Sequence, residues 1–204
     1  MEALKTIEKN GLILKIFQDE VPDSSDPRDW DNLGTIVAFH RRYDLGDKHS
    51  FSDEEAVLAH IEETGAVALP VFMYDHSGIS LSTSNAGYPF NCEWDSGQVG
   101  VIFVEKAKIL EAYAVKELTD DIRSKVIACL KGEIKVYSQY LNGEVYGYTI
   151  ERKVAAGTSC PTCHHAEPEH LEDIDSCWGF IGEEHVESEA MSMLDHALKN
   201  QKGE

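Results

Sequence analysis

Short apolar runs, most of them bounded by glycine, asparagine or aspartate, recur along this chain and predict β-strands. The run at 34–40 is apolar enough to form a central strand. Two runs that flank His76-Ser77-Gly78 predict a hairpin. The predicted strands are 11–17, 34–40, 66–75, 79–82, 99–104 and 145–152.

Apolar residues that recur every three or four positions predict helices between these strands. Ser52 is expected to cap the first helix, with Glu55 reaching back in a capping box, and Gly65 is expected to end it. Thr119 is expected to cap the second helix, which Gly132 can divide into two.

A last helix is predicted over 184–199, where apolar residues again have helical spacing. Helices that lie between strands and hairpins indicate an α+β fold. We therefore expect a single domain spanning 1–204, with a mixed or mainly antiparallel sheet and about three to four helices.

Three segments resemble one another and predict turns that lead into strands: Trp30-Asp31-Asn32, Trp94-Asp95-Ser96 and Ile174-Asp175-Ser176. Each places Asp-Asn or Asp-Ser before a glycine and an apolar run, and these residue types favour tight turns. If the turns meet at one rim of a sheet, they form a ligand site beside partly buried tryptophans. The alternative is three ordinary turns. The tryptophans are Trp30, Trp94 and Trp178.

The chain is strongly acidic, with 37 Asp and Glu against 18 Lys and Arg and a formal net charge of −19. This balance excludes a general role in binding nucleic acid or anionic membranes and favours a basic partner, metal cations or simple solubility. Nine acidic residues and no Lys or Arg lie between Glu167 and Glu189, which indicates a solvated surface or a partner-binding face.

The sequence also bears on where the protein acts. It lacks an apolar run of the roughly 18 residues that a membrane span needs, and its first residues do not follow the signal-peptide pattern. Five cysteines, an odd number, argue against a secreted disulfide framework. We therefore expect a cytoplasmic protein.

A loop at 158–178 has the spacing of a structural zinc site. Two cysteines separated by two residues, Cys160 and Cys163, can reach one Zn²⁺ from a tight turn, and Cys177 can supply a third thiolate. The fourth ligand is His165 or one of its neighbours His164 and His170. The alternative is a loop with free thiols and solvated imidazoles.

The segment 39–49 is the only cationic island in this acidic chain. Arg41 and Arg42, next to His40, can grip a phosphate or carboxylate. The alternative is that these arginines pair with nearby aspartates.

Several motifs together resemble a family of proteins carried by bacteriophages and mobile elements. They are Trp30-Asp31-Asn32-Leu33-Gly34-Thr35, His40-Arg41-Arg42-Tyr43 with Leu45-Gly46-Asp47, Trp94-Asp95-Ser96-Gly97-Gln98-Val99-Gly100 and Asp175-Ser176-Cys177-Trp178-Gly179-Phe180. The resemblance brings no activity with it. It implies an accessory protein of a phage or plasmid that acts in the bacterial cytoplasm.

Two functions follow from these features. The first is an acidic binding module that mimics DNA and inhibits a host defence factor by occupying its basic surface. The alternative is a binder of a phosphorylated small ligand such as a nucleotide, or a metal-dependent enzyme; the sequence shows no catalytic residues and favours binding over catalysis. The ligand-site residues would be Asp31, His40, Arg41, Arg42, Asp95, Ser96, Asp175, Ser176 and Trp178.

Overall fold

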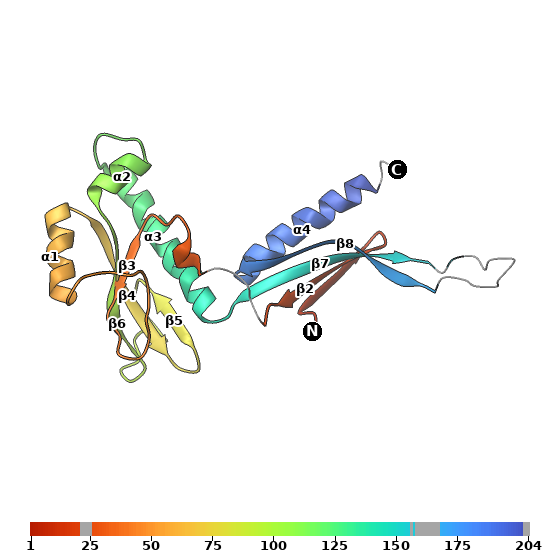
Figure 1. Cartoon of the computed structure of the whole chain (residues 1–204), viewed down its shortest axis with the longest axis horizontal. Coiled ribbons are helices and arrows are strands. Elements are labelled where there is room, and N and C mark those ends of the chain that lie inside the picture. The colour runs from red at the N-terminus through yellow and green to blue at the C-terminus, as the bar shows by residue number, and fades with distance from the viewer. Residues whose placement is uncertain (21–25, 156, 158–167, 202–204) are drawn as a thin grey trace. The chain divides into compact units, whose positions relative to one another are not determined.

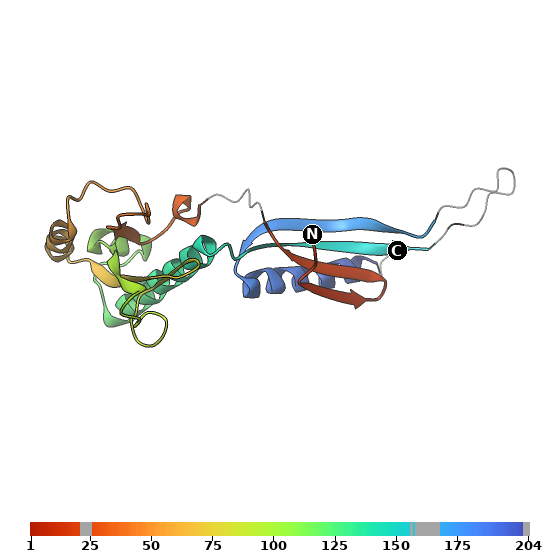
Figure 2. The same cartoon turned by 90° about the horizontal axis from the view of Figure 1, so that it is seen from below.

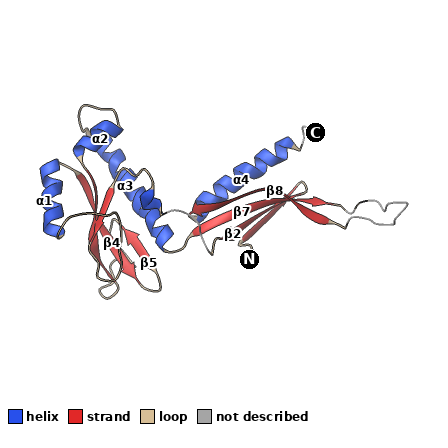
Figure 3. Ribbon diagram, in the orientation of Figure 1, coloured by secondary structure: helices blue, strands red, loops and turns tan. Residues whose placement is uncertain are grey.

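The computed structural model describes residues 1–20, 26–155, 157 and 168–201. Contacts within the chain group it into two compact units. The terminal unit comprises Met1–Ser24 and Gly143–Glu204, and the central unit comprises Ser25–Asn142. Each unit has its own four-stranded sheet (Figure 3).

The sheet of the central unit has the strand order β3–β6–β4–β5, with every neighbouring pair antiparallel. Antiparallel pairing fixes which ends of the strands meet: Thr35, at the start of β3, lies opposite Phe103, near the end of β6. The strands are β3 (Thr35–Ala38), β4 (Val67–Asp75), β5 (Ile79–Ser82) and β6 (Ser96–Val104).

Helices cover both faces of this sheet (Figure 1). The long helix α3 (Asp120–Leu141) packs its apolar stripe on one face, where Ile36 and Ile102 are fully buried. Helix α1 (Glu54–Thr64) packs on the opposite face through Val57. Successive strand residues point to opposite faces, so β3 and the 99–104 part of β6 are apolar on both faces.

Two short elements complete the central unit. The 3₁₀ turn η1 (Pro27–Asp29) precedes β3, and helix α2 (Lys106–Ala112) follows β6.

A buried ion-pair network holds η1 against β3 and α3. The Arg28 side chain is only 5% exposed and donates to both Asp47 carboxylate oxygens, at 3.1 and 2.7 Å, and to Glu133 at 3.1 Å. Glu133 also accepts the backbone N–H groups of Leu33 and Gly34. Burial alone would lower the pKa of Arg28, but its two carboxylate partners outweigh burial and leave the pKa raised.

The sheet of the terminal unit has the strand order β1–β2–β7–β8, again antiparallel throughout. Helix α4 (Glu183–Asn200) lies along one face of this sheet (Figure 2). It buries Val186, Ala190 and Leu194 against Leu14 and Ile150. The strands are β1 (Lys5–Lys9), β2 (Leu12–Gln18), β7 (Val145–Val154) and β8 (His170–Ile181).

The α+β class, the antiparallel sheets and the four α-helices confirm the predicted fold class. Thr119 caps α3, and Gly65, in the left-handed conformation, ends α1, as predicted. The predicted cap of α1 was wrong by one residue, because Asp53 accepts the Ala56 N–H while the Ser52 hydroxyl donates to Asp53. Gly132 does not divide α3.

Among the described helices, none combines the length and the apolar character that crossing a membrane requires.

Candidate functional site

The three Asp-containing segments do not meet at one rim, which corrects the predicted common site. Asp31 precedes β3 and Asp95 precedes β6. Since these strands pair antiparallel, they start at opposite ends of the sheet. Asp175 does not lie in a turn at all: it is inside β8, in the terminal unit.

The same topology brings four of the predicted site residues together, Asp95 among them. His40 and Arg42 follow the end of β3, which pairs with the beginning of β6, where Asp95 and Ser96 lie. With Asp75 of β4, they line a hollow of about 300 Å³ that we call the β6-start hollow. Trp94 at its margin was expected to be partly buried but is 91% exposed.

Arg42 is already neutralised in the β6-start hollow. Its guanidinium forms an ion pair with Asp75 and lies 5.3 Å from the centre of the Tyr43 ring. The Tyr43 hydroxyl also donates to Asp75, at 3.2 Å. Because Asp95 adds a second carboxylate, with His76 Nδ1 3.5 Å from it, the hollow is a poor site for an anion.

Arg41 is exposed and makes no ion pair with any residue that the structure describes. It is not among the residues that line the β6-start hollow.

Near the β6-start hollow, a hydrogen bond with the Tyr88 hydroxyl, together with slight burial and neighbouring charges that include Asp95, raises the pKa of Tyr74 to about 12.

A larger hollow, of about 650 Å³, lies at the other end of the β3–β6 pair. We call it the β6-end hollow. Four of its lining residues carry aromatic rings, the phenylalanines Phe51 and Phe103 and the histidines His49 and His60. Phe51 lies 5.3 Å from His60 and 6.4 Å from Phe103, measured between ring centres. Two lysines also line it, Lys48 from the cationic island and Lys108 from α2.

The two lysines of the β6-end hollow are not neutralised by carboxylates. Lys108 Nζ donates to the neutral carbonyl oxygen of Asn32, at 2.9 Å, and Lys48 forms no ion pair within the described part of the chain. The one carboxylate lining the hollow, Glu105, lies 2.9 Å from His60 Nε2. The hollow therefore keeps a local positive charge in an acidic protein.

Most residues of the β6-end hollow carry no signal in the sequence. Lys48 and His49 belong to the cationic island at 39–49, which did not predict a site here. Phe51, Phe103 and Lys108 carry no motif, and only the strand register, which places the end of β6 beside the start of β3, brings them together.

Trp178 and Ser176 lie in β8, where Trp178 has a structural role. Its indole ring covers Gly147 on the neighbouring strand β7, so that a Cβ at residue 147 would collide with the ring. It also stacks on Phe17 at 5.9 Å between ring centres, and it is 42% exposed. Ser176 is exposed and pairs with Thr149.

The zinc prediction falls mainly outside the described residues, which do not include Cys160, Cys163 or His165. Cys177 is described and is an exposed free thiol on β8. No group of three or more His, Cys, Asp or Glu side chains suited to a metal ion is found among the described residues. The zinc site stays a prediction.

Comparison of the chain with protein-family models, curated proteins and solved structures finds no match.

Proposed function

We propose that the central unit binds a phosphorylated small molecule with an aromatic base, a nucleotide, in the β6-end hollow. The observation that supports this is the pairing of aromatic walls with two lysines, Lys48 and Lys108, that no carboxylate neutralises. A binder of a phosphorylated small ligand was the alternative function predicted from the sequence, but the residues of the β6-end hollow are not the ones predicted to bind it.

The size of the hollow suits such a ligand. Small-molecule sites usually enclose roughly 300–1,000 Å³ and combine apolar walls with a few polar groups. At about 650 Å³ the β6-end hollow falls within this range. Stacking of a base on an aromatic ring contributes about 1–3 kcal/mol, and Phe51 and His60 offer ring surface for it.

Charge also favours this hollow over the β6-start hollow. A phosphate needs a cation that is not already paired, which Lys48 provides and Arg42 does not. The negative charge of the chain repels a long nucleic acid, which would extend over the acidic surface beyond the hollow. A mononucleotide is small enough to stay beside the two lysines, where salt screens the more distant carboxylates.

The test is calorimetric titration of the full chain with AMP and ATP. We expect binding that weakens at least about tenfold when Lys48→Met and Lys108→Met are combined. Arg42→Met and the α2 surface change Lys106→Met serve as matched charge controls and should leave the affinity unchanged. Absence of binding by the unaltered chain, or equal loss in the control variants, contradicts the proposal.

A second candidate function is the acidic binding module, an inhibitor of a basic host protein that acts in the bacterial cytoplasm as a phage accessory protein. The terminal unit favours it, because its sequence holds 18 acidic against 7 basic residues. Exposed carboxylates follow β8 and α4, although two on α4 are paired with lysines of β1, Glu187 with Lys5 and Asp195 with Lys9.

This candidate predicts a different pattern of mutational effects. Reversing the charge of Glu183, Glu184 and Glu189 should abolish protection of a phage in bacteria that carry a DNA-targeting defence, because a mimic of DNA needs its surface carboxylates. Arg41→Ala and Arg42→Ala should keep that protection. The measurement is phage plating efficiency; protection that survives the charge reversals contradicts the module.

A further inference from the structure

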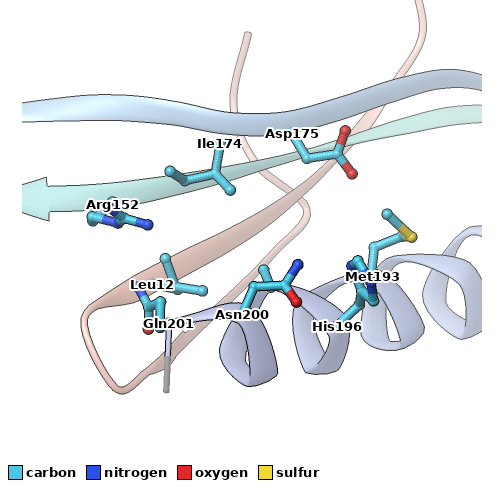
Figure 4. Close-up of a pocket in the computed structure, with 9 residues that line it drawn as sticks. Leu12, Arg152, Ile174, Asp175, Met193, His196, Asn200 and Gln201 are labelled. Atoms are coloured by element: carbon cyan, nitrogen blue, oxygen red, sulfur yellow. The ribbon is translucent and has the colours of Figure 1, made fainter. Parts of the chain in front are cut away.

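We propose that the terminal unit holds a second ligand site, for a small zwitterion of the α-amino-acid kind. The site is a hollow of about 230 Å³ between the C-terminal half of α4 and the facing sheet. Figure 4 shows the side chains that line it, with Arg152 and Asp175 on the sheet side and His196 and Asn200 on the helix side.

The floor of the hollow is apolar. Leu12 is 1% exposed and belongs to the core between α4 and the sheet. Ile174 and Met193 are partly buried and pack against the same core. A ligand in the hollow therefore meets an apolar surface on which an aliphatic side chain gains burial.

Arg152, on β7, has an unsatisfied hydrogen-bond donor at this hollow. Its Nε is buried and has no hydrogen-bond partner among the described residues. Its nearest ion-pair contact is loose, with Nη1 3.8 Å from Glu172. A buried donor without a partner is unfavourable. The Arg152 side chain as a whole is 38% exposed and lines the hollow, so a ligand carboxylate can bind the accessible part of its guanidinium.

Asp175 supplies the opposite charge. The pairing of β7 with β8 shifts register at this point, with Ile150 opposite Asp175 and Glu151 opposite Asp173, so Ile174 is the extra residue of a β-bulge. The Tyr148 hydroxyl donates to Asp175 Oδ2 at 3.1 Å, and burial together with this bond raises the pKa of Tyr148. The Tyr148 hydroxyl therefore stays protonated and keeps its hydrogen bond to the Asp175 carboxylate.

The spacing of the two charges fits one small molecule. Arg152 lies two residues beyond Ile150, the partner of Asp175, so the two backbone positions are about 7 Å apart along the strands and about 4.8 Å apart across them. This separation allows one ligand to reach Arg152 with its carboxylate and Asp175 with its ammonium group.

The charges argue against a phosphate here. A dianion would lie close to Asp175 and Glu172 with Arg152 as the cation, whereas a zwitterion matches one positive and one negative group. The volume of about 230 Å³ also limits the ligand to a small molecule.

The experiment is ligand-observed NMR of the full chain with L-leucine and L-methionine, followed by calorimetry. Two analogues of leucine each lack one of its charged groups: isocaproate has no ammonium group, and isoamylamine has no carboxylate. We expect both analogues to bind at least about tenfold more weakly than leucine. This comparison uses the unaltered protein and does not depend on any variant folding.

Variants locate the site. Arg152→Met and Asp175→Asn should each weaken leucine binding at least about tenfold. The control variants Lys153→Met and Asp173→Asn remove the same kind of charge from nearby residues of the same strands, and they should not alter leucine binding. Thermal unfolding checks that all four variants fold. The proposal is overturned if neither amino acid binds, if isocaproate binds as tightly as leucine, or if the control variants lose binding equally.

Discussion

Replacing Arg28 by methionine should destabilise the central unit by about 3 kcal/mol, the loss expected when one partner of a buried ion pair is removed. Arg28 is 5% exposed, and its partners Asp47 and Glu133 are 22% and 10% exposed. Without the guanidinium, two carboxylates stay largely buried with no compensating cation. The measurement is urea unfolding followed by fluorescence, from which the free energy of unfolding is obtained.

Two further variants make this result specific. Arg28→Lys keeps the charge but loses the planar fork that reaches both Asp47 oxygens, so we expect an intermediate loss. Lys125→Met removes only an exposed pair with Asp121 one helical turn away and should cost less than about 0.5 kcal/mol. A loss below about 1 kcal/mol for Arg28→Met would show that the network contributes little to stability.

The network also shows what the sequence could not reveal. Asp47 follows Arg28 by 19 residues and Glu133 follows it by 105 residues, and nothing in the sequence marks the three as partners. Only the folded chain brings them together. In contrast, helix limits depend on local chemistry: Thr119 and Gly65 act on backbone groups within a few residues of themselves, so the sequence predicted both.

Strand β8 is the main element that the sequence analysis misread. Its acidic residues and its Asp175-Ser176 pair favour a turn, yet 170–181 forms a strand. The reason is tertiary: β8 pairs with β7 along its whole length, with register shifts between Tyr146 and Gly147 and between Ile150 and Glu151. The site prediction failed for a related reason, since local patterns do not reveal which strand ends meet.

Gly100 is expected to be the most sensitive glycine of the central sheet. It pairs with Ala38 of β3 on one side and with Val71 of β4 on the other. A Cβ on this residue would collide with the carbonyl oxygen of Val37 and lie 2.7 Å from Ala38 Cα. These are backbone atoms of a paired strand, so they cannot move aside as a flexible side chain can.

We therefore expect Gly100→Ala to cost about 3 kcal/mol, at the upper end for overpacking, and to displace β3 from β6. Gly97→Ala on the same strand is the matched control, because a Cβ there has no heavy atom within 4 Å; its effect should stay within about 1 kcal/mol. Urea unfolding gives both values. Because the β6-end hollow depends on the pairing of these strands, nucleotide binding should fall with Gly100→Ala and persist with Gly97→Ala. Equal stability of the two variants would show that β3 shifts to accept the methyl group without loss.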